Sequence, residues 1–86
     1  MYTVYVLYSP NYDKIYIGYS SDVATRFKYH NELAWKGWTL KFRPWIIAHT
    51  EEFDSKAKAL RREKQLKTAM GRRYIRNEII SKFIQK

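Results

Sequence analysis

Two tyrosines near the start of the chain can place their hydroxyl groups on one face of a hairpin. If residues 9–14 form the turn, Tyr5 lies opposite Gly18, and Leu7 lies opposite Tyr16. Side chains alternate between faces along a strand, and directly opposite residues share a face, so both tyrosines point the same way. Gly18 has no side chain and leaves space across from Tyr5. On spacing alone, two core rings with separately bonded hydroxyls are the commoner arrangement, and a reactive hollow is the alternative.

Arg26 and His30 follow on a predicted helix and share one helical face, because they are four residues apart. An Arg guanidinium is always charged and presents a planar fork that fits phosphate oxygens. A His side chain gains or loses a proton near neutral pH. The pair therefore suits phosphate binding, although such a pair taken alone usually lies on a solvated face.

Glu63 is a carboxylate in an otherwise apolar helical stripe. Ala59, Glu63, Leu66 and Met70 are spaced by four, three and four residues, which places them on one helical face. A carboxylate there costs free energy unless it is paired or bound to a metal. The surrounding Lys and Arg residues allow a salt bridge. The alternative is one divalent ion held by this carboxylate, several waters and a substrate phosphate.

Three strands and three helices are predicted to position these residues. Residues 2–8, which are rich in Tyr and Val, and residues 15–19 predict two strands joined by a turn. A third strand begins after Pro44 and ends near Glu51 or Glu52. The order β-β-α-β-α-α predicts an α+β fold, in which helices flank a small three-stranded antiparallel sheet.

The first predicted helix follows the capping residues 20–22 and runs to about Leu33. Val23 and Phe27, together with Leu33 or Ala34, are expected on its inner side.

The second helix is predicted over about residues 55–69, with Gly71 ending it. Residues 35–43 predict a loop or an exposed edge. The last helix is predicted from apolar residues at helical spacing, at positions 75, 79, 80, 83 and 84.

Length, charge and cysteine content restrict the classes of function. The chain has 86 residues, which predicts one domain, residues 1–86. Its net charge of +9 attracts polyanions, above all nucleic acid. The absence of Cys excludes a disulfide framework and favours a reducing, cytoplasmic setting. No run approaches the roughly 20 apolar residues of a membrane span, so we expect a soluble protein.

An ordered set of motifs unites the reactive residues. Val4-Tyr5 stands where the end of a GIY motif would, and residues 16–18 read YIG. Arg26 follows eight residues after that glycine, His30 comes one helical turn later, and residues 60–63 read LRRE. The set resembles the GIY-YIG nuclease superfamily over nearly the whole chain. It is most similar to the small stand-alone bacterial members related to the N-terminal nuclease domain of the excision-repair subunit UvrC.

The resemblance implies a role for each of these residues. Tyr5 and Tyr16 would lie beside the scissile phosphate and orient or activate the attacking water. Arg26 would bind the phosphate, and His30 would assist proton transfer. Glu63 would be the single protein ligand of one Mg²⁺ or Mn²⁺ ion, which would polarise the phosphate. The implied activity is a metal-dependent endonuclease that hydrolyses DNA phosphodiester bonds, in repair or recombination.

Three positions bear on how closely the chain follows the family. Thr3 replaces the first Gly of GIY, and a Thr suits a strand. Tyr19 stands where the UvrC-like members often have a Lys, so one candidate phosphate contact is missing. The family often has a late Asn in its site, and Asn77 is the candidate here.

Other basic residues are expected to contact the nucleic-acid backbone. With Arg26, they are Lys58, Arg61, Arg62, Lys64, Arg72 and Arg73. Residues 35–45 mix aromatic rings with Lys and Arg. Such rings most often fill a thin core, and base stacking or an interface between two copies are the alternatives.

The expected partner is DNA, with RNA as an alternative, and the expected state is a monomer or weak homodimer. Proteins of a repair complex are possible further partners. The alternative function is a nucleic-acid-binding module that keeps the nuclease fold without useful turnover. Both functions predict binding that weakens with salt, because counterions are released when phosphates are neutralised. Metal-dependent cleavage, and not affinity, therefore separates them.

Overall fold

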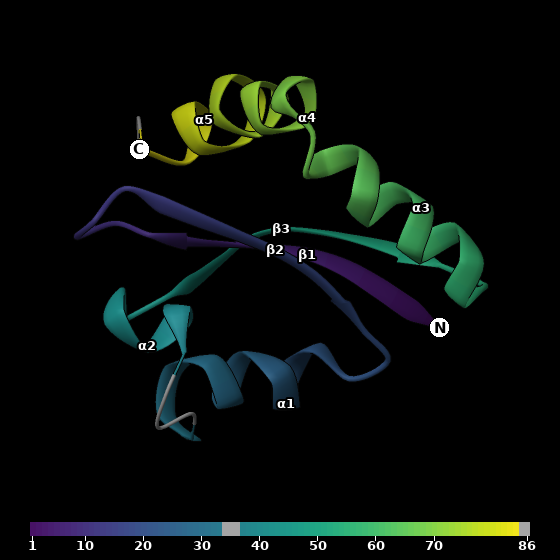
Figure 1. Cartoon of the computed structure of the whole chain (residues 1–86), viewed down its shortest axis with the longest axis horizontal. Coiled ribbons are helices and arrows are strands. Elements are labelled where there is room, and N and C mark those ends of the chain that lie inside the picture. Colours follow the sequence, from purple (N-terminus) through teal and green to yellow (C-terminus); the bar gives the residue numbers. More distant parts are fainter. Residues whose placement is uncertain (34–36, 85–86) are drawn as a thin grey trace.

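The protein is described by a computed structural model, which covers residues 1–33 and 37–84. Three strands, β1 (Tyr2–Ser9), β2 (Lys14–Ser20) and β3 (Ile46–Phe53), form an antiparallel sheet in the order β2-β1-β3 (Figure 1). Helices flank this sheet, so the predicted α+β architecture is confirmed. β1 is the central strand, and six consecutive residues of it are buried.

The hairpin register agrees with the prediction. Tyr5 pairs with Gly18, and Leu7 pairs with Tyr16. The turn between the strands places Asp13 in the left-handed region, at a φ of 54°.

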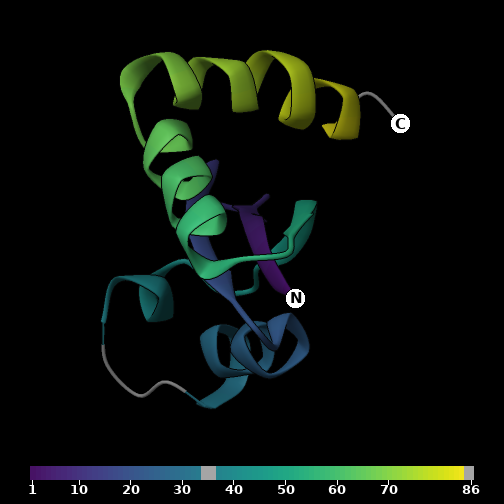
Figure 2. The ribbon, with the colours of Figure 1, turned by 90° about the vertical axis from the view of Figure 1, so that its right-hand side faces the viewer.

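Helices from the second half of the chain cover one face of the sheet: α3 (Lys56–Leu66), α4 (Ala69–Tyr74), the π-helical segment η2 (Ile75–Ile80) and α5 (Ser81–Ile84) (Figures 1 and 2). Val4 and Val6 of β1 pack there with Leu66 and Ile75, which are buried. Ile80 is also buried and Ile79 packs against this core, as the helical spacing predicts. The predicted positions 83 and 84 have side chains outside the described part of the chain.

The opposite face carries α1 (Val23–Lys28), its π-helical continuation η1 (Tyr29–Leu33) and the short helix α2 (Trp38–Lys41) (Figure 1). Val23 and Phe27 pack against a second core formed by Tyr5, Leu7 and Trp45, which confirms their inward orientation. The Asp22 carboxylate caps α1 by accepting a bond from the Thr25 amide at 3.2 Å.

Asn31 ties η1 to the start of β3. Its side-chain oxygen accepts a bond from the Trp45 amide at 2.6 Å, and its amide nitrogen donates to the Trp45 carbonyl at 2.9 Å. Both faces of the central hairpin are therefore covered by helices, and the Tyr5 face looks toward η1.

Several local predictions were wrong. Leu33 is 57% exposed, so it does not face inward, and its alternative Ala34 lies outside the described residues. Residues 38–41 form the helix α2 inside the segment predicted as a loop. Met70 is 79% exposed, so it does not extend the apolar stripe.

The second helix ends at Leu66, before the predicted end at residue 69, and Gly71 does not end it. Thr68 is the physical reason, because its hydroxyl donates to the Gln65 carbonyl at 2.7 Å and accepts from the Gly71 amide at 3.1 Å. Such local bonds compete with helix continuation and cap the new helix α4. A Cβ at Gly71 would lie 2.5 Å from the Leu66 Cα, so glycine permits this close turn between the helices.

Within the described residues, we find no helix with the length and apolar content that a membrane crossing requires.

Candidate active site

Tyr5, Tyr16 and His30 form a cluster of rings on the η1 side of the sheet. The Tyr5 hydroxyl lies 3.3 Å from His30 Nε2. The Tyr16 and His30 ring centroids are 4.6 Å apart, and those of the two tyrosines are 6.3 Å apart. Tyr5 is buried and Tyr16 is half-buried. The two tyrosines therefore share one face, and they converge on a histidine that comes from a different element.

Gly18 permits this arrangement because it faces the Tyr5 ring directly. A Cβ at position 18 would lie 2.6 Å from the Tyr5 hydroxyl oxygen and 2.7 Å from its Cζ. Any side chain there would displace the Tyr5 hydroxyl. The space across from Tyr5 that the hairpin register predicts is thus filled by the tyrosine itself.

Both tyrosines are neutral in the resting protein. Burial raises the pKa of Tyr5, and the nearby Tyr16 hydroxyl raises it further, whereas the Arg26 guanidinium opposes this shift. Burial likewise raises the pKa of Tyr16, against the charge of Arg26. Each tyrosine at this site therefore needs a proton acceptor before it can take a proton from water.

Arg26 lies at the open side of the cluster. It is exposed, and its guanidinium carbon lies 5.0 Å from the centroid of the Tyr29 ring. Its charge acts on Tyr5, Tyr16 and His30. Its charge is thus available beside the tyrosines, and its role as a phosphate ligand stays a prediction.

His30 is buried and is held from both ring nitrogens. Nε2 faces the Tyr5 hydroxyl, and Nδ1 lies 3.3 Å from the Thr39 Oγ1. Burial lowers the pKa of His30, and the charges of Arg26 and Arg43 lower it further. A neutral imidazole with a hydrogen on Nδ1 donates to Thr39 and presents Nε2 as an acceptor to Tyr5.

Thr39 is a site residue that the sequence did not predict. It is buried in α2, and its backbone carbonyl accepts a bond from the Trp45 indole at 2.9 Å. Its segment resembled a loop, and a single Thr among aromatic residues carries no periodic signal. The contact arises only when α2 packs against η1.

Glu63 lies on α3, and its charge acts on both tyrosines of the cluster. Its side chain is 12% exposed, and its carboxylate lies 3.7 Å from the Lys67 ammonium group. Its negative charge makes a small contribution to the raised pKa of both Tyr5 and Tyr16. The salt bridge that the sequence allowed is therefore present, and the role of Glu63 as a metal ligand stays a prediction.

The donor set suits a hard divalent ion held by a single protein ligand. The described residues contain no group of three His, Cys, Asp or Glu side chains that would form an all-protein metal cage. Glu63 supplies one carboxylate, and its partner Lys67 is 46% exposed, so the ammonium group can move aside. Mg²⁺ accepts this arrangement when waters and substrate phosphate complete its coordination.

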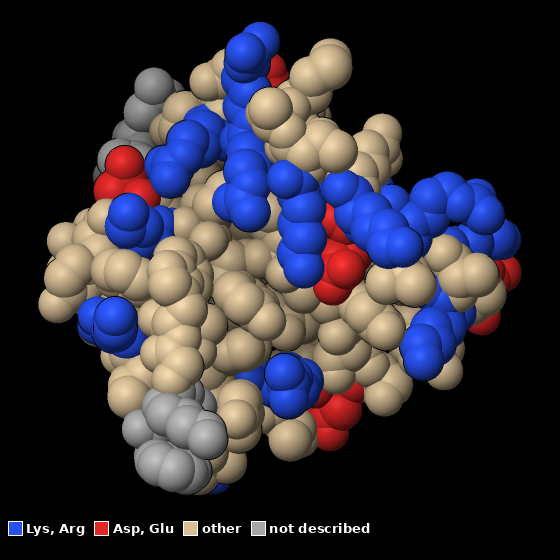
Figure 3. Space-filling view, viewed as in Figure 1, with Lys and Arg blue, Asp and Glu red and all other residues tan. Residues whose placement is uncertain are grey.

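Most of the other predicted nucleic-acid contacts are exposed. These are Lys58, Arg61, Lys64, Arg72 and Arg73. Figure 3 shows that Lys and Arg side chains gather over α3 and α4 on the face of the molecule drawn there. This face is positive enough to attract a polyanion.

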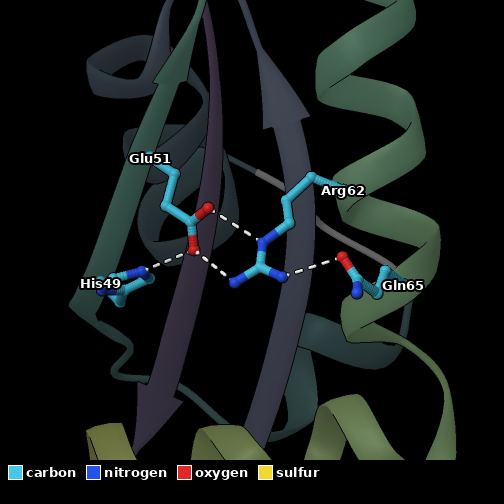
Figure 4. A network of polar contacts seen from close by, with 4 residues as sticks. All are labelled: His49, Glu51, Arg62 and Gln65. Carbon is cyan, nitrogen blue, oxygen red and sulfur yellow. Dashed lines mark hydrogen bonds and ion pairs between the residues drawn. The ribbon is translucent and has the colours of Figure 1, made fainter.

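Arg62 differs from these residues because its guanidinium is engaged within the protein. Its Nε and one terminal nitrogen donate to the two Glu51 oxygens at 2.9 and 3.1 Å. The other terminal nitrogen donates to Gln65 at 2.9 Å, and His49 contacts Glu51 at 2.8 Å (Figure 4). Arg62 thus ties α3 to β3.

Asn77 is exposed on η2. The neighbouring Arg76 pairs with Asp13 at the hairpin turn at 2.9 Å. A role of Asn77 in the site stays a prediction.

Comparison with known proteins agrees with the fold. The family model of the GIY-YIG catalytic domain matches residues 1–76. The chain therefore belongs to the GIY-YIG family, and this membership supports an endonuclease-like function that acts on DNA.

The relatives are small proteins of similar length. A UPF0213 protein of Halobacterium salinarum is 39% identical over 67 residues, which cover 78% of this chain and 86% of that protein. A UPF0213 protein of Bacillus velezensis is 36% identical over 75 residues, which cover 84% of this chain and 76% of that protein. The similarity to small GIY-YIG proteins that the motifs indicate is thus confirmed.

Proposed function

We propose that the protein is a divalent-metal-dependent endonuclease that hydrolyses DNA phosphodiester bonds. The observation that supports this most strongly is that Tyr5, Tyr16, Arg26, His30 and Glu63 come from five elements, and that both tyrosines contact His30 while the charges of Arg26 and Glu63 act on both tyrosines. Such a meeting of two hydroxyls, a proton acceptor, a fixed cation and a carboxylate serves phosphate-ester hydrolysis. The whole chain, residues 1–86, forms this nuclease domain.

Arg26 holds the scissile phosphate at the open side of the site. Its planar fork fits two phosphate oxygens, and it stabilises the negative charge that grows on them during hydrolysis. Glu63 would hold one Mg²⁺ or Mn²⁺ ion. When bound, this ion neutralises charge on the phosphate and on the leaving oxygen.

Tyr5 activates the attacking water together with His30. The water proton passes to the Tyr5 oxygen while the Tyr5 proton passes to His30 Nε2, which becomes positively charged. Thr39 keeps the hydrogen of His30 on Nδ1 and so keeps Nε2 free to accept. Tyr16, which is more exposed than Tyr5, orients the water and the phosphate.

Replacing Thr39 with Val is expected to lower the cleavage rate by about tenfold or more, since general-base catalysis contributes roughly 10² to 10⁴ and depends on orientation. In the wild type, cleavage should be lost as the pH falls through the lowered pKa of His30, that is, below its ordinary value of 6.5. Thr39→Val should also change this acidic limb. Rates measured across pH, with saturating metal, check both expectations.

Thr39→Ser is the matched control, because it keeps the hydroxyl and removes only a methyl group. It should restore most of the rate. A Thr39→Val enzyme with the wild-type rate and pH profile would contradict the assignment.

The nucleic-acid contacts in this proposal are Arg26 and the exposed basic residues of α3 and α4. Arg62 is left out because its guanidinium is bonded to Glu51 and Gln65. We further propose a cytoplasmic protein acting in DNA repair or recombination, as a monomer or weak homodimer.

A cleavage panel tests the function. Purified protein is incubated with labelled single-stranded, duplex and branched DNA, in Mg²⁺, in Mn²⁺ and in chelator. The proposal expects cleavage of at least one substrate in metal and none in chelator. Salt-sensitive binding without cleavage of any substrate would instead support the binding-module alternative.

A further inference from the structure

A groove of about 590 Å³ opens beside Tyr16 of the candidate active site. It runs along β2 and reaches α2 on one side and the α3–α4 junction on the other. The polar and aromatic residues that line it are Lys14, Tyr16, Trp38, Lys67, Arg72 and Arg76. The groove thus combines aromatic rings with positive charge next to a residue of the site.

Trp38 presents an anchored aromatic ring to this groove. It is 47% exposed. Its ring centroid lies 4.8 Å from that of Phe42, 5.6 Å from that of Trp45 and 6.5 Å from that of Tyr16. The Trp38 and Tyr16 rings are within 29° of parallel. Trp38 is therefore held from the protein side while much of its surface faces solvent, so a ligand ring can stack on it with little loss of side-chain freedom.

The charges around Trp38 suit phosphate groups. Lys14 and Arg72 are exposed, and Arg72 Nε donates to the Lys67 carbonyl at 3.2 Å, which holds its guanidinium beside the groove. Lys67 connects the groove to the site through its 3.7 Å contact with Glu63. Arg76 is paired with Asp13 at 2.9 Å, so its charge is already balanced within the protein.

We propose that this groove binds a nucleotide next to the cleaved phosphate, with the base unpaired and stacked on Trp38. Lys14, Lys67 and Arg72 contact its phosphates. A base inside a duplex is already stacked on its neighbours, so it cannot give its face to Trp38 unless it leaves the helix. The inference rests on the proposed function and narrows it, because the substrate becomes DNA with unpaired nucleotides at the point of cleavage.

Binding measured in chelator tests this subsite without requiring cleavage. A labelled single strand and the same sequence as a blunt duplex are titrated with wild type, Trp38→Ala and Trp38→Leu. The Leu variant keeps apolar packing against Trp45 and removes the aromatic face. Both variants should bind the single strand about tenfold or more weakly, as expected for loss of one stacked base, while duplex affinity changes by less than about twofold.

Two controls make the result specific. Trp38→Phe keeps an aromatic face and should retain most single-strand affinity. Tyr74→Ala removes an aromatic residue of similar exposure, 44%, that lies outside the groove, and it should bind like wild type. Equal losses for single strand and duplex in the Trp38 variants, or no loss for either, would overturn the subsite.

The subsite and the nuclease function can fail separately. If Trp38-dependent single-strand binding is observed but no DNA is cut in metal, the nuclease proposal is wrong and the proposed nucleotide subsite is supported. If DNA is cut in metal but Trp38→Leu binds single strands like wild type, the proposed nucleotide subsite is wrong and the nuclease function is supported.

Discussion

Replacing Arg26 with Ala is expected to lower the rate of DNA cleavage by roughly 10²- to 10³-fold, the usual cost of removing one fixed group that stabilises transition-state charge. Arg26 is exposed, and in the proposed reaction it acts on the phosphate itself. The free energy of unfolding should change by less than about 0.5 kcal/mol, as is usual for an exposed residue. Single-turnover cleavage and thermal unfolding of the same preparation measure both quantities.

Lys28→Ala is the charge-matched control for this prediction. Lys28 is an exposed cation on the same helix, two residues further along. It should keep nearly the full rate, so a general loss of positive charge cannot explain the Arg26 effect. Arg26→Lys should rescue the rate poorly, because an ammonium group lacks the planar fork. Equal rates for Arg26→Ala and Lys28→Ala would remove Arg26 from the site.

Replacing Arg62 with Ala is expected to cause a large loss of stability, in contrast to the replacement of Arg26. The change leaves the Glu51 carboxylate, whose side chain is 24% exposed, without the guanidinium that bonds both of its oxygens. A hydrogen bond to a charged group contributes about 1.5 to 3 kcal/mol to the free energy of unfolding. Breaking a fully buried ion pair costs more. Because this pair is partly exposed, we expect a loss of about 1.5 to 3 kcal/mol, measured by chemical denaturation near neutral pH.

The stabilisation by the Arg62–Glu51 pair should depend on pH in a defined direction. Partial burial alone would raise the pKa of Glu51, but the bonds from Arg62 and His49 outweigh burial and lower it below its ordinary value of 4.5. A lowered pKa gives stability that is present above pH 4.5 and is lost as the pH falls through the folded-state pKa. The difference between wild type and Arg62→Ala should therefore shrink in acid.

Lys58→Ala is the control for Arg62→Ala. Lys58 pairs with Asp54 at 3.2 Å, but the two side chains are 59% and 72% exposed. Removing such a surface pair should cost less than about 1 kcal/mol. If Arg62→Ala lowers the free energy of unfolding no more than Lys58→Ala does, the Arg62–Glu51 pair does not stabilise the contact between β3 and α3 as proposed.

The hairpin and the two tyrosines were predictable because a strand has a period of two and the register follows from the turn. Once Tyr5 lies opposite Gly18, the face of Tyr16 is fixed. The three-stranded antiparallel sheet with flanking helices followed from the order of the elements. Local signals of this kind need no knowledge of how distant segments pack.

The contacts that were not predicted depend on how distant segments meet. Arg62 lies in a run of basic residues that looks uniformly exposed, and its partner Glu51 comes from a strand that α3 crosses. Thr39 meets His30 only because α2 folds back against η1. Glu63 is a residue that the sequence marks as unusual without deciding its role. The helical stripe marks it as unusual, but only the ordered family motifs favour a metal ligand over its salt bridge with Lys67.

Single-turnover cleavage by Glu63→Gln, beside Glu78→Gln, tests the central claim most directly. Both glutamates pair with a Lys four residues later, at 3.7 Å for Glu63 and 3.8 Å for Glu78. Both changes remove one negative charge, but of these two glutamates only Glu63 carries a charge that acts on the tyrosines. In Mg²⁺, we expect Glu63→Gln to cut at least about 10²-fold more slowly than wild type, and Glu78→Gln to cut like wild type. A Glu63→Gln enzyme that cuts DNA at the wild-type rate would contradict the account.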